Sequence, residues 1–295
     1  MPPDPDEGGT PTRFGYVRDR LIVEPGRPAG LADRDPAWVG GPEFDQLSEK
    51  ELKATAEEIL SRGVADLSRA QELLWASDTY ALLVVFQAID AAGKDSTIEH
   101  VMSGVNPQGV SVVSFRQPSD EELDHDFLWR ISEALPERGR IGIFNRSHYE
   151  DVLVVRVHDL VPQAEWSKRY AQINAFEREV IASGTRIVKV MTHISKDEQK
   201  ARLRERLERP DKHYKYNPGD VDERLHWDDY MEAYQVALTR TSTKGAPWYV
   251  VPANKKWYAR YAVQQLLLDA LTDMDPTWPV MDFDVAAELK RLDAS

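Results

Sequence analysis

The chain of 295 residues is acidic, with 37 lysines and arginines against 50 aspartates and glutamates and a formal net charge of −13. The electrostatic field of a chain with this negative charge repels polyanions, so any site for nucleic acid or phosphate must depend on a local cluster of basic residues. The absence of cysteine excludes disulfides, thiolate metal sites and thiol catalysis. Hydrophobic residues make up 42% of the chain, as in ordinary globular proteins, and no apolar run is long enough to span a bilayer.

Residues 1–42 are rich in Pro, Gly, Asp and Arg, which predicts a partly ordered tail draped over a single domain formed by residues 43–295. The opening MPPDPDEGGTPTR has no basic n-region and no apolar h-region, so we expect no signal peptide and a cytoplasmic location. Ser48, with Glu51 at the third position, predicts a capping box at the start of a helix. The apolar stripe of this helix allows a break near Gly63.

From Tyr80 onward, short apolar runs alternate with segments of helical pattern. The predicted strands are residues 81–86, 110–115, 141–144, 186–191 and 248–251. Helices are predicted after Gly93 and at residues 121–134 (capped by Ser119 and Glu122), 148–157, 164–182, 196–208, 222–238 and 258–271. Strands that alternate with helices are joined by right-handed crossovers, so we expect an α/β fold with a parallel sheet covered on both faces.

A phosphate-binding loop is indicated by FQAIDAAGKDS, residues 86–96, which follows a predicted strand and opens a helix. The common form is G-x-x-x-x-G-K-[ST]; here Ala88 stands at the first glycine and Asp95 at the hydroxyl position. Gly93 lets the backbone approach a phosphate, and the helix start together with Lys94 attracts the anion. An ordinary strand-to-helix turn beside a surface lysine is the alternative.

Asp90 lies inside this loop, where a carboxylate repels phosphate unless a cation lies between them. We therefore expect Asp90 to hold Mg²⁺, directly or through water. A base for the acceptor phosphate is the second possibility, and a simple turn or capping residue is the structural alternative.

A second group of polar residues follows the predicted strand IGIF. Asn145, Arg146 and Tyr149 of NRSHYED stand at the carboxyl end of that strand, where open α/β sheets bind ligands. Arg146 can bridge phosphate oxygens with two parallel hydrogen bonds, unless it serves only as a cap or an ion-pair partner.

A basic segment, KARLRERLERPDKHYK at residues 200–215, holds seven lysines and arginines against three acidic residues. On a helix, Leu203 and Leu207 are expected to anchor to the core. Arg202, Arg206 and Arg209 share an adjacent face. The Pro-interrupted RPDKHYKYNPGD that follows predicts a mobile lid over the phosphate loop, although most charge runs are simply solvated helix faces. Nearby, Asn254-Lys255-Lys256-Trp257 resembles the guanine-reading N-K-x-D, but Trp257 stands where the aspartate is required.

Several long blocks together resemble the polyphosphate kinase 2 family. The resemblance covers about Phe44 to Leu271, in FQAIDAAGKDSTIEHVMSGVNPQG, ELDHDFLWR, ALPERGRIGIFNRSHYEDVLVVRVH, HISKDEQKARLRERLERPDKHYKYNPGD, WDDYMEAY and APWYVVPANKKW. It is greatest to the third class, the polyphosphate:nucleotide phosphotransferases that charge nucleoside mono- and diphosphates. Members of the other classes carry glycine at the Ala88 and Asp95 positions and aspartate at the Asn145 position.

The resemblance implies a P-loop-kinase-like three-layer α/β/α sandwich with a central parallel sheet and a helical lid at about residues 196–226. The donor would be inorganic polyphosphate, the acceptors AMP and ADP and other purine nucleotides, and the required ion Mg²⁺, with Mn²⁺ as a substitute. The expected catalytic residues are Asp90, Lys94 and Arg146, with Asp90 also holding the metal. The expected substrate-binding residues are Ala91, Ala92, Gly93, Asp95, Ser96, Asn145, Glu150, Arg130, Arg206, Lys212, Lys215 and Arg224.

Within this set, Glu150 is expected to help choose the acceptor, with a solvated helix glutamate as the alternative. Two rival functions remain: an ATP-dependent nucleotide or small-molecule kinase of similar fold, and a non-catalytic regulator that binds polyphosphate. We expect no nucleic-acid partner, because the basic residues lack interleaved aromatics. We expect no membrane partner either, and self-association as a homo-oligomer.

Overall fold

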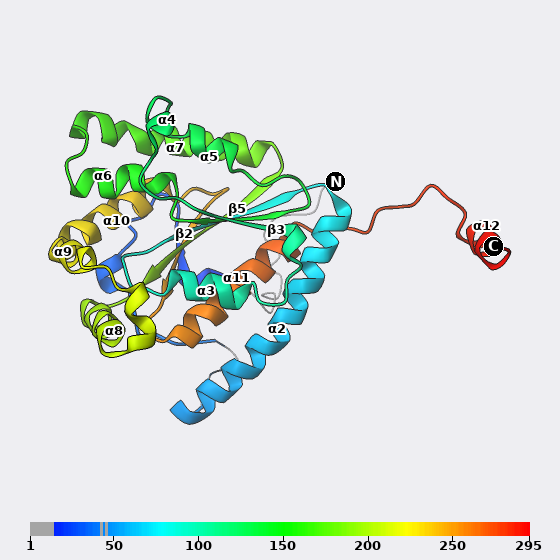
Figure 1. Cartoon of the computed structure of the whole chain (residues 1–295), viewed down its shortest axis with the longest axis horizontal. Helices are drawn as coiled ribbons and strands as arrows, with labels where there is room; N and C mark the ends of the chain where they lie inside the picture. The colour runs from blue at the N-terminus through cyan, green and yellow to red at the C-terminus, as the bar shows by residue number, and fades with distance from the viewer. Residues whose placement is uncertain (1–14, 42–43, 45–46) are drawn as a thin grey trace, which may run out of the picture.

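The computed structural model describes residues 15–41, 44 and 47–295, and within them the strands form one six-stranded sheet (Figure 1). The strand order is β1-β6-β5-β2-β4-β3. The strands are β1 (Ile22–Val23), β2 (Ala81–Gln87), β3 (Val110–Ser114), β4 (Ile141–Asn145), β5 (Thr185–His193) and β6 (Trp248–Pro252). All five strands predicted from the apolar runs are present, so the α/β class is confirmed.

The central strands are parallel, and their register brings their carboxyl ends to one edge of the sheet. Phe86 of β2 pairs with Asn145 of β4, and Gln87 pairs with Met191 of β5. Every residue of β2 is buried, as expected for a run of ALLVVFQ with helices on both faces. The loops that follow β2, β4 and β5 therefore meet at the same edge, where open α/β sheets bind ligands.

Helices cover both faces of the sheet and give the three-layer α/β/α arrangement that the family resemblance implies (Figure 1). One layer contains α2 (Glu49–Ser77), α3 (Lys94–Val101) and α11 (Lys256–Asp273). The opposite layer contains α4 (Asp120–Leu123), α5 (Trp129–Glu133), α6 (Val154–Val157), α7 (Gln163–Ala182) and α10 (Trp227–Thr241). At the carboxyl edge lie α8 (Lys196–Glu208), the 3-10 helix η4 (Pro210–Lys215) and α9 (Gly219–Leu225), within the range expected for the lid.

Helix α2 begins with the predicted capping box of Ser48 and Glu51, but it runs without the break allowed at Gly63. The reason lies in helix packing. A Cβ atom at Gly63 would stand 2.0 Å from the side-chain oxygen of Gln264, so only glycine lets α11 approach α2 this closely. The Gln264 amide then donates to the carbonyl of Leu60 at 3.2 Å.

Three predicted helices are each divided in two. The segment expected at 121–134 ends as α4 and restarts as α5, because Asp126 accepts the backbone N–H of Leu128 and so begins a new helix. The segment expected at 148–157 is the 3-10 helix η3 (His148–Val152) followed by α6, with Leu153 between them in a non-helical conformation. The segment expected at 222–238 divides at His226 into α9 and α10. The hydrogen bond from Leu128 to the Asp126 side chain therefore explains the division between α4 and α5, because such local bonds compete with a continuous helix.

The N-terminal region contributes more structure than a tail. Residues 15–41 include α1 (Gly15–Leu21), β1 and the 3-10 helix η1 (Leu31–Asp33). Strand β1 pairs antiparallel with β6 and completes that edge of the sheet. Arg34 holds the connection by donating to the carbonyls of Leu21, Ile22 and Ala29. The rest of the expected tail, residues 1–14, and the expected boundary at residues 42–43 lie outside the described residues.

The remaining elements are the 3-10 helix η2 (Pro107–Gly109), before β3, and α12 (Val285–Asp293), which stands away from the body of the molecule (Figure 1). Across the described ranges, no helix is both long and apolar enough to cross a membrane.

Candidate active site

The loop between β2 and α3 has the backbone of a phosphate cradle. Ala91 has φ +62° and Gly93 has φ +90°, and Gly93 is the residue before the first turn of α3. A side chain at Gly93 would be strained in this conformation and would also meet the Arg202 guanidinium at 3.2 Å. Residues 93–96 line a pocket, and the first N–H groups of a helix have no partner within it, which is the arrangement that binds phosphate.

Helix α8 holds this loop from behind. The buried Arg202 donates to the carbonyl of Ala91 at 3.1 Å and to the carbonyls of Ala253 and Asn254. The Gln199 amide donates to the carbonyl of Asp90 at 3.0 Å. Arg202 and Arg206, predicted to share a face of this helix, both line the cleft over the loop, whereas Arg209 does not. The hydrogen bonds of Arg202 also fix the shape of the loop.

The apolar anchors of α8 also differ from expectation. Leu203 is buried, as predicted. Leu207 is 52% exposed and does not anchor the helix, because Pro210 ends α8 and turns the chain before a further apolar layer forms.

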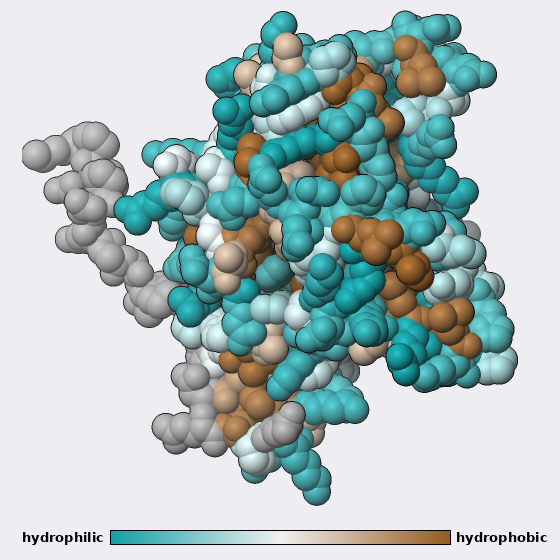
Figure 2. Space-filling model, turned by 90° about the vertical axis from the view of Figure 1, so that its left-hand side faces the viewer, coloured by the Kyte–Doolittle hydropathy of each residue, from teal (hydrophilic) through white to brown (hydrophobic). Residues whose placement is uncertain are grey.

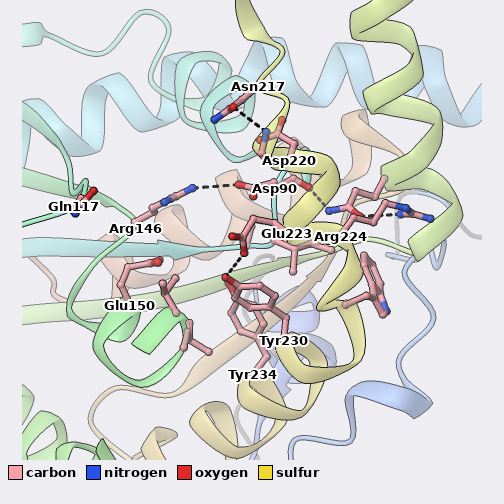
Figure 3. Close-up of a pocket in the computed structure, with 17 residues that line it drawn as sticks. Asp90, Gln117, Arg146, Glu150, Asn217, Asp220, Glu223, Arg224, Tyr230 and Tyr234 are labelled. Atoms are coloured by element: carbon pink, nitrogen blue, oxygen red, sulfur yellow. Dashed lines mark hydrogen bonds and ion pairs between the residues drawn. The ribbon is translucent and has the colours of Figure 1, made fainter. Parts of the chain in front are cut away.

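Arg146 and Asp90 face each other across the cleft. Arg146 donates to the Asp90 carboxylate at 3.2 Å, and its backbone N–H donates to Phe86 at 3.1 Å (Figure 3). Arg146 has φ +64°, a strained value for a residue with a side chain. Burial lowers the pKa of the guanidinium, but the carboxylates of Glu150 and Asp90 outweigh burial and raise it. The cation is thus fixed and permanently charged where β4 ends.

Asp95, at the hydroxyl position of the loop motif, bonds to a residue of strand β4. The Asn145 amide donates to the Asp95 carboxylate at 2.6 Å, and the Lys94 ammonium lies 3.8 Å from the same carboxylate. Ser96, the next hydroxyl along the chain, donates to the carbonyl of Gly93 and so stays within its own helix turn. The bond between Asp95 and Asn145 joins the start of α3 to the end of β4. The sequence did not reveal this pairing, because the two residues are 50 positions apart.

A basic pocket of about 760 Å³ lies over the loop. Its lining includes eight lysines and arginines against four acidic side chains, in a chain whose net charge is strongly negative. The basic members are Lys94, Arg116, Arg146, Arg202, Arg206, Lys212, Lys215 and Lys256. We call this space the donor pocket, after the polyphosphate donor that the family resemblance implies. Figure 2 views the molecule from the side where α8 and α9 lie in Figure 1, and this face is largely hydrophilic.

Two of these cations were missed in the sequence. Arg116 follows β3, and nothing in the local pattern marks it. Lys256 belongs to the segment Asn254–Trp257, whose guanine-reading interpretation fails, and yet Lys256 lines the donor pocket. Asn254 has a separate structural role, since its side-chain oxygen accepts the N–H of Ser195 just before α8.

A second pocket, of about 460 Å³, opens on the other side of the Asp90–Arg146 pair (Figure 3). Its walls combine apolar and aromatic groups with carboxylates, in contrast to the basic donor pocket. We call it the acceptor pocket, after the nucleotide acceptor that the family resemblance implies. Its principal members are Glu150, Leu153, Val154, Glu223, Trp227, Tyr230 and Tyr234. Ile89, Asp90, Arg146 and Asp220 line both pockets, so the two spaces meet at the ion pair.

The aromatic wall of the acceptor pocket was missed by the sequence interpretation. Trp227, Tyr230 and Tyr234 follow one face of α10 at helical spacing, a signal that WDDYMEAY contains. Tyr230 donates to the Glu223 carboxylate at 2.7 Å, and the ring of His158 lies 3.0 Å from the same carboxylate (Figure 3 shows the first bond). This bonding joins α9 to the opposite layer and fixes the floor of the pocket.

The other expected substrate-binding residues are distributed as follows. Ala91, Ala92, Gly93, Asp95, Ser96, Asn145, Arg206, Lys212 and Lys215 line the donor pocket, and Glu150 and Arg224 line the acceptor pocket. Burial raises the pKa of Glu150, against the opposing charge of Arg146. Arg130 lines neither pocket. It is buried, donates to the carbonyl of Arg116 at 2.9 Å and lies 3.6 Å from Glu122.

The carboxylates near the loop suit a metal that arrives with phosphate. In the part of the chain that the structure describes, no group of three or more His, Asp or Glu side chains could hold a metal ion alone. Mg²⁺ usually takes one or two carboxylates together with phosphate oxygens and water. Asp90, which is partly exposed at the junction of the pockets, and Asp220, which lines both, fit that description.

A glycine-containing loop between a parallel strand and a helix, lined by basic residues of α8 and η4, is typical of a phosphotransferase of the P-loop-kinase kind. The polyphosphate kinase 2 (PPK2) family model matches residues 50–279, and the chain belongs to this family.

Similar proteins agree with this assignment. An ADP-polyphosphate phosphotransferase of Rhodopseudomonas palustris is 48% identical over 78% of this chain and 83% of its own length. An AMP/ADP-polyphosphate phosphotransferase of Meiothermus ruber is 52% identical over 72% of this chain and 80% of its own. The crystal structure of polyphosphate kinase 2 from Arthrobacter aurescens TC1 is similar with a TM-score of 0.88 and 49% identity, covering 95% of this chain and 97% of that one.

Proposed function

We propose that this protein transfers the terminal phosphate of inorganic polyphosphate to AMP and ADP, and to other purine nucleotides, with Mg²⁺. The observation that carries the proposal is the junction of two unlike pockets at Asp90 and Arg146. One pocket suits a long anion and the other suits a nucleoside.

The donor pocket fits a polyanion without a base. Its cations come from the loop and α3, from the end of β3 and from the lid, so positive charge extends along the cleft and is not confined to one point. Lys212 and Lys215 of η4 stand at the lid, and Lys256 begins α11. A row of separate ammonium and guanidinium groups can contact successive phosphates of a chain.

The acceptor pocket fits a nucleoside. Trp227, Tyr230 and Tyr234 provide flat apolar surface for a purine ring. Glu150 and Glu223 accept hydrogen bonds, which is what the amino groups of a base and the hydroxyls of a ribose donate. The phosphates of AMP or ADP would then point to Arg146, where the two pockets meet.

The transfer itself asks the protein mainly for alignment and for neutralisation of charge. Lys94, the N–H groups at the start of α3 and Arg146 would contact the transferring group, and Asp95 with Asn145 would keep α3 and β4 at a fixed distance. Mg²⁺, held by Asp90 with Asp220 nearby, would neutralise charge on the phosphate oxygens. No covalent intermediate on the protein is required.

A direct assay separates this function from its rivals. Purified protein is given polyphosphate with AMP or ADP, in Mg²⁺ and without ATP, and nucleoside di- and triphosphates are measured by chromatography. We expect ADP from AMP and ATP from ADP. Transfer that requires ATP as donor would support the ATP-dependent kinase instead. Tight binding of polyphosphate with no turnover would support the non-catalytic regulator.

Glu150→Ala is expected to raise the KM for the acceptor about 10- to 100-fold, or to change the ratio of AMP to ADP efficiency, because a buried hydrogen bond to a charged group contributes about 1.5–3 kcal/mol. The KM for polyphosphate should stay within twofold, since Glu150 does not line the donor pocket. Steady-state kinetics with each substrate varied in turn measures both. Glu165→Ala, which removes an exposed carboxylate of α7, is the matched control. Unchanged constants for both acceptors in Glu150→Ala would assign selectivity to another residue.

A further inference from the structure

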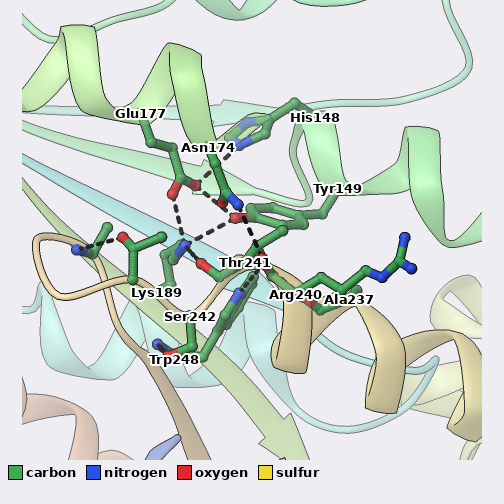
Figure 4. A network of polar contacts seen from close by, with 12 residues as sticks. His148, Tyr149, Asn174, Glu177, Lys189, Ala237, Arg240, Thr241, Ser242 and Trp248 are labelled. Atoms are coloured by element: carbon green, nitrogen blue, oxygen red, sulfur yellow. Dashed lines mark hydrogen bonds and ion pairs between the residues drawn. The ribbon is translucent and has the colours of Figure 1, made fainter. Parts of the chain in front are cut away.

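A closed cluster of buried polar side chains lies behind the acceptor pocket, between the sheet and α7 (Figure 4). Lys189 comes from β5, Glu177 from α7 and Tyr149 from η3. The exposed fraction is 0% for Lys189 and Tyr149 and 2% for Glu177. None of the three lines either pocket, so the transfer reaction gives no direct use for them.

The hydrogen bonds of this cluster leave little freedom. The Lys189 ammonium donates to Glu177 Oε2 at 2.7 Å, to the Tyr149 hydroxyl at 2.9 Å and to the carbonyl of Thr241 at 2.7 Å. Its three donors are therefore all used. The Tyr149 hydroxyl in turn donates to Glu177 Oε1 at 2.7 Å, which closes the triangle. The ammonium also lies 5.3 Å from the centre of the Trp248 ring.

Stability alone does not account for such a cluster. Taking an ammonium and a carboxylate out of water is costly, and well-packed apolar replacements for a buried ion pair are often neutral or stabilising. What a fully bonded cluster provides, and an apolar cluster does not, is one fixed orientation for each participating element. The orientation matters for two of these elements, η3 and α10, because their residues line the acceptor pocket.

Tyr149 stands in the segment that carries the site. Three residues before it, Arg146 has its strained φ of +64°, and Glu150 follows it directly. Ser147, between them, accepts the Gln87 amide at 3.1 Å. Thr241, whose carbonyl accepts from Lys189, ends α10, the helix that carries the aromatic wall. A strained backbone persists only when its surroundings determine it.

We propose that Tyr149, Glu177 and Lys189 form a positioning unit that sets Arg146 and Glu150 of the η3 segment, and the end of α10, for binding and aligning the acceptor. The kinetic effects that we expect from this unit assume the proposed function, transfer of phosphate from polyphosphate to AMP or ADP. The unit contacts no substrate and acts through Arg146, Glu150 and α10.

Tyr149→Phe tests the unit by removing one hydroxyl and no carbon. We expect kcat to fall and the acceptor KM to rise, by about 10- to 100-fold in kcat/KM, as a misplacement of about 1 Å can produce. The KM for polyphosphate should change much less than the acceptor KM, because seven of the eight donor-pocket cations, all but Arg146, stand outside residues 146–152. Tyr258→Phe is the control: Tyr258 of α11 is equally buried, its hydroxyl donates to the carbonyl of Gly40 at 2.8 Å, and α11 packs on the face of the sheet away from α7. Equal kinetic effects of the two variants, or none in Tyr149→Phe, would overturn the proposal.

An apolar replacement of the whole cluster separates positioning from stability. The triple variant Tyr149→Phe, Glu177→Met, Lys189→Met leaves no unpaired charge, so it is expected to unfold at a higher temperature than Lys189→Met alone, although the His148 ring and the carbonyl of Thr241 also lose a partner. It should nevertheless show the acceptor defect of Tyr149→Phe. A triple variant that is folded and has wild-type kinetics would contradict the proposal. If the triple variant does not fold, the comparison of Tyr149→Phe with Tyr258→Phe still tests whether the cluster positions the acceptor site.

Hydrogen–deuterium exchange gives a readout that does not depend on the reaction. The amides of residues 146–152 should exchange faster in Tyr149→Phe than in the wild type, and at the wild-type rate in Tyr258→Phe. This result holds even if the wild type fails to transfer phosphate from polyphosphate, so failure of the proposed function and failure of the positioning unit are distinct. Unchanged exchange in Tyr149→Phe would reject the unit.

Discussion

Lys94→Met is expected to lower kcat by about 10²–10³-fold or more, as removal of a major electrostatic stabiliser does. Lys94 lies at the first position of α3, with 14% of its side chain exposed, and lines the donor pocket. Burial lowers the pKa of this ammonium and the nearby Asp95 carboxylate opposes the shift, so the charge is placed where water screens it poorly. Steady-state kinetics with polyphosphate and ADP measures the loss.

The fold should survive this substitution, because methionine keeps most of the apolar stem of Lys94 and removes a charge that is only 14% exposed. The thermal unfolding midpoint and circular dichroism check this. Lys53→Met is the control, since Lys53 is an exposed lysine of α2 that lines neither pocket. Near-wild-type turnover in a folded Lys94→Met would refute the phosphate-loop assignment.

Asp90→Asn is expected to lower activity by about 10²-fold and to raise the Mg²⁺ concentration needed for half-maximal rate, as changes around a metal site typically do. Asparagine keeps the shape of aspartate but loses the charge that holds a hard cation. It also removes the ionic partner of Arg146, which lines both pockets. The rate as a function of Mg²⁺ concentration, with EDTA-treated protein as the starting point, measures the effect.

Asp211→Asn provides the matched control, because Asp211 is an exposed carboxylate of η4 whose ion-pair partner is Arg209. This variant should keep the wild-type dependence on Mg²⁺. If Asp90→Asn works equally well at low Mg²⁺, then Asp90 does not hold the metal, and Asp220 and the phosphates are left as its ligands.

The sequence predicts an element correctly where residues within that element decide its structure. The run ALLVVF predicts a buried parallel strand because its side chains must be covered on both faces, and β2 is buried throughout. The capping boxes at Ser48 and Ser119 are also local, and both are present. Where a contact with a residue far along the chain decides the structure of an element, local patterns do not predict it. Gly63 suggests a break in a helix, but Gln264 of α11 requires a small residue there and the helix continues.

The candidate site follows the same rule. Asp90, Gly93 and Lys94 can be placed from the spacing of one loop, and Arg146 from its position after a strand, because parallel strands bring such loops to one edge. The acceptor pocket required the fold. Its wall combines residues of η3, α9 and α10, and the sequence gives no sign that helix 222–238 divides at His226 to form it.

The sequence by itself therefore determined the α/β class, the glycine-containing loop and the basic segment 200–215, since these depend on spacing within short segments and on local charge, while the resemblance of several long blocks pointed to the family. The tertiary structure alone decided that Asp95 bonds to Asn145, that Arg202 supports the loop from behind and that Arg130 lies outside both pockets. It also joined Tyr149, Glu177 and Lys189 behind the acceptor pocket. Hydrogen bonds and ion pairs act over about 3–4 Å in space, whatever the distance along the chain, so only the folded arrangement of the elements selects these partners.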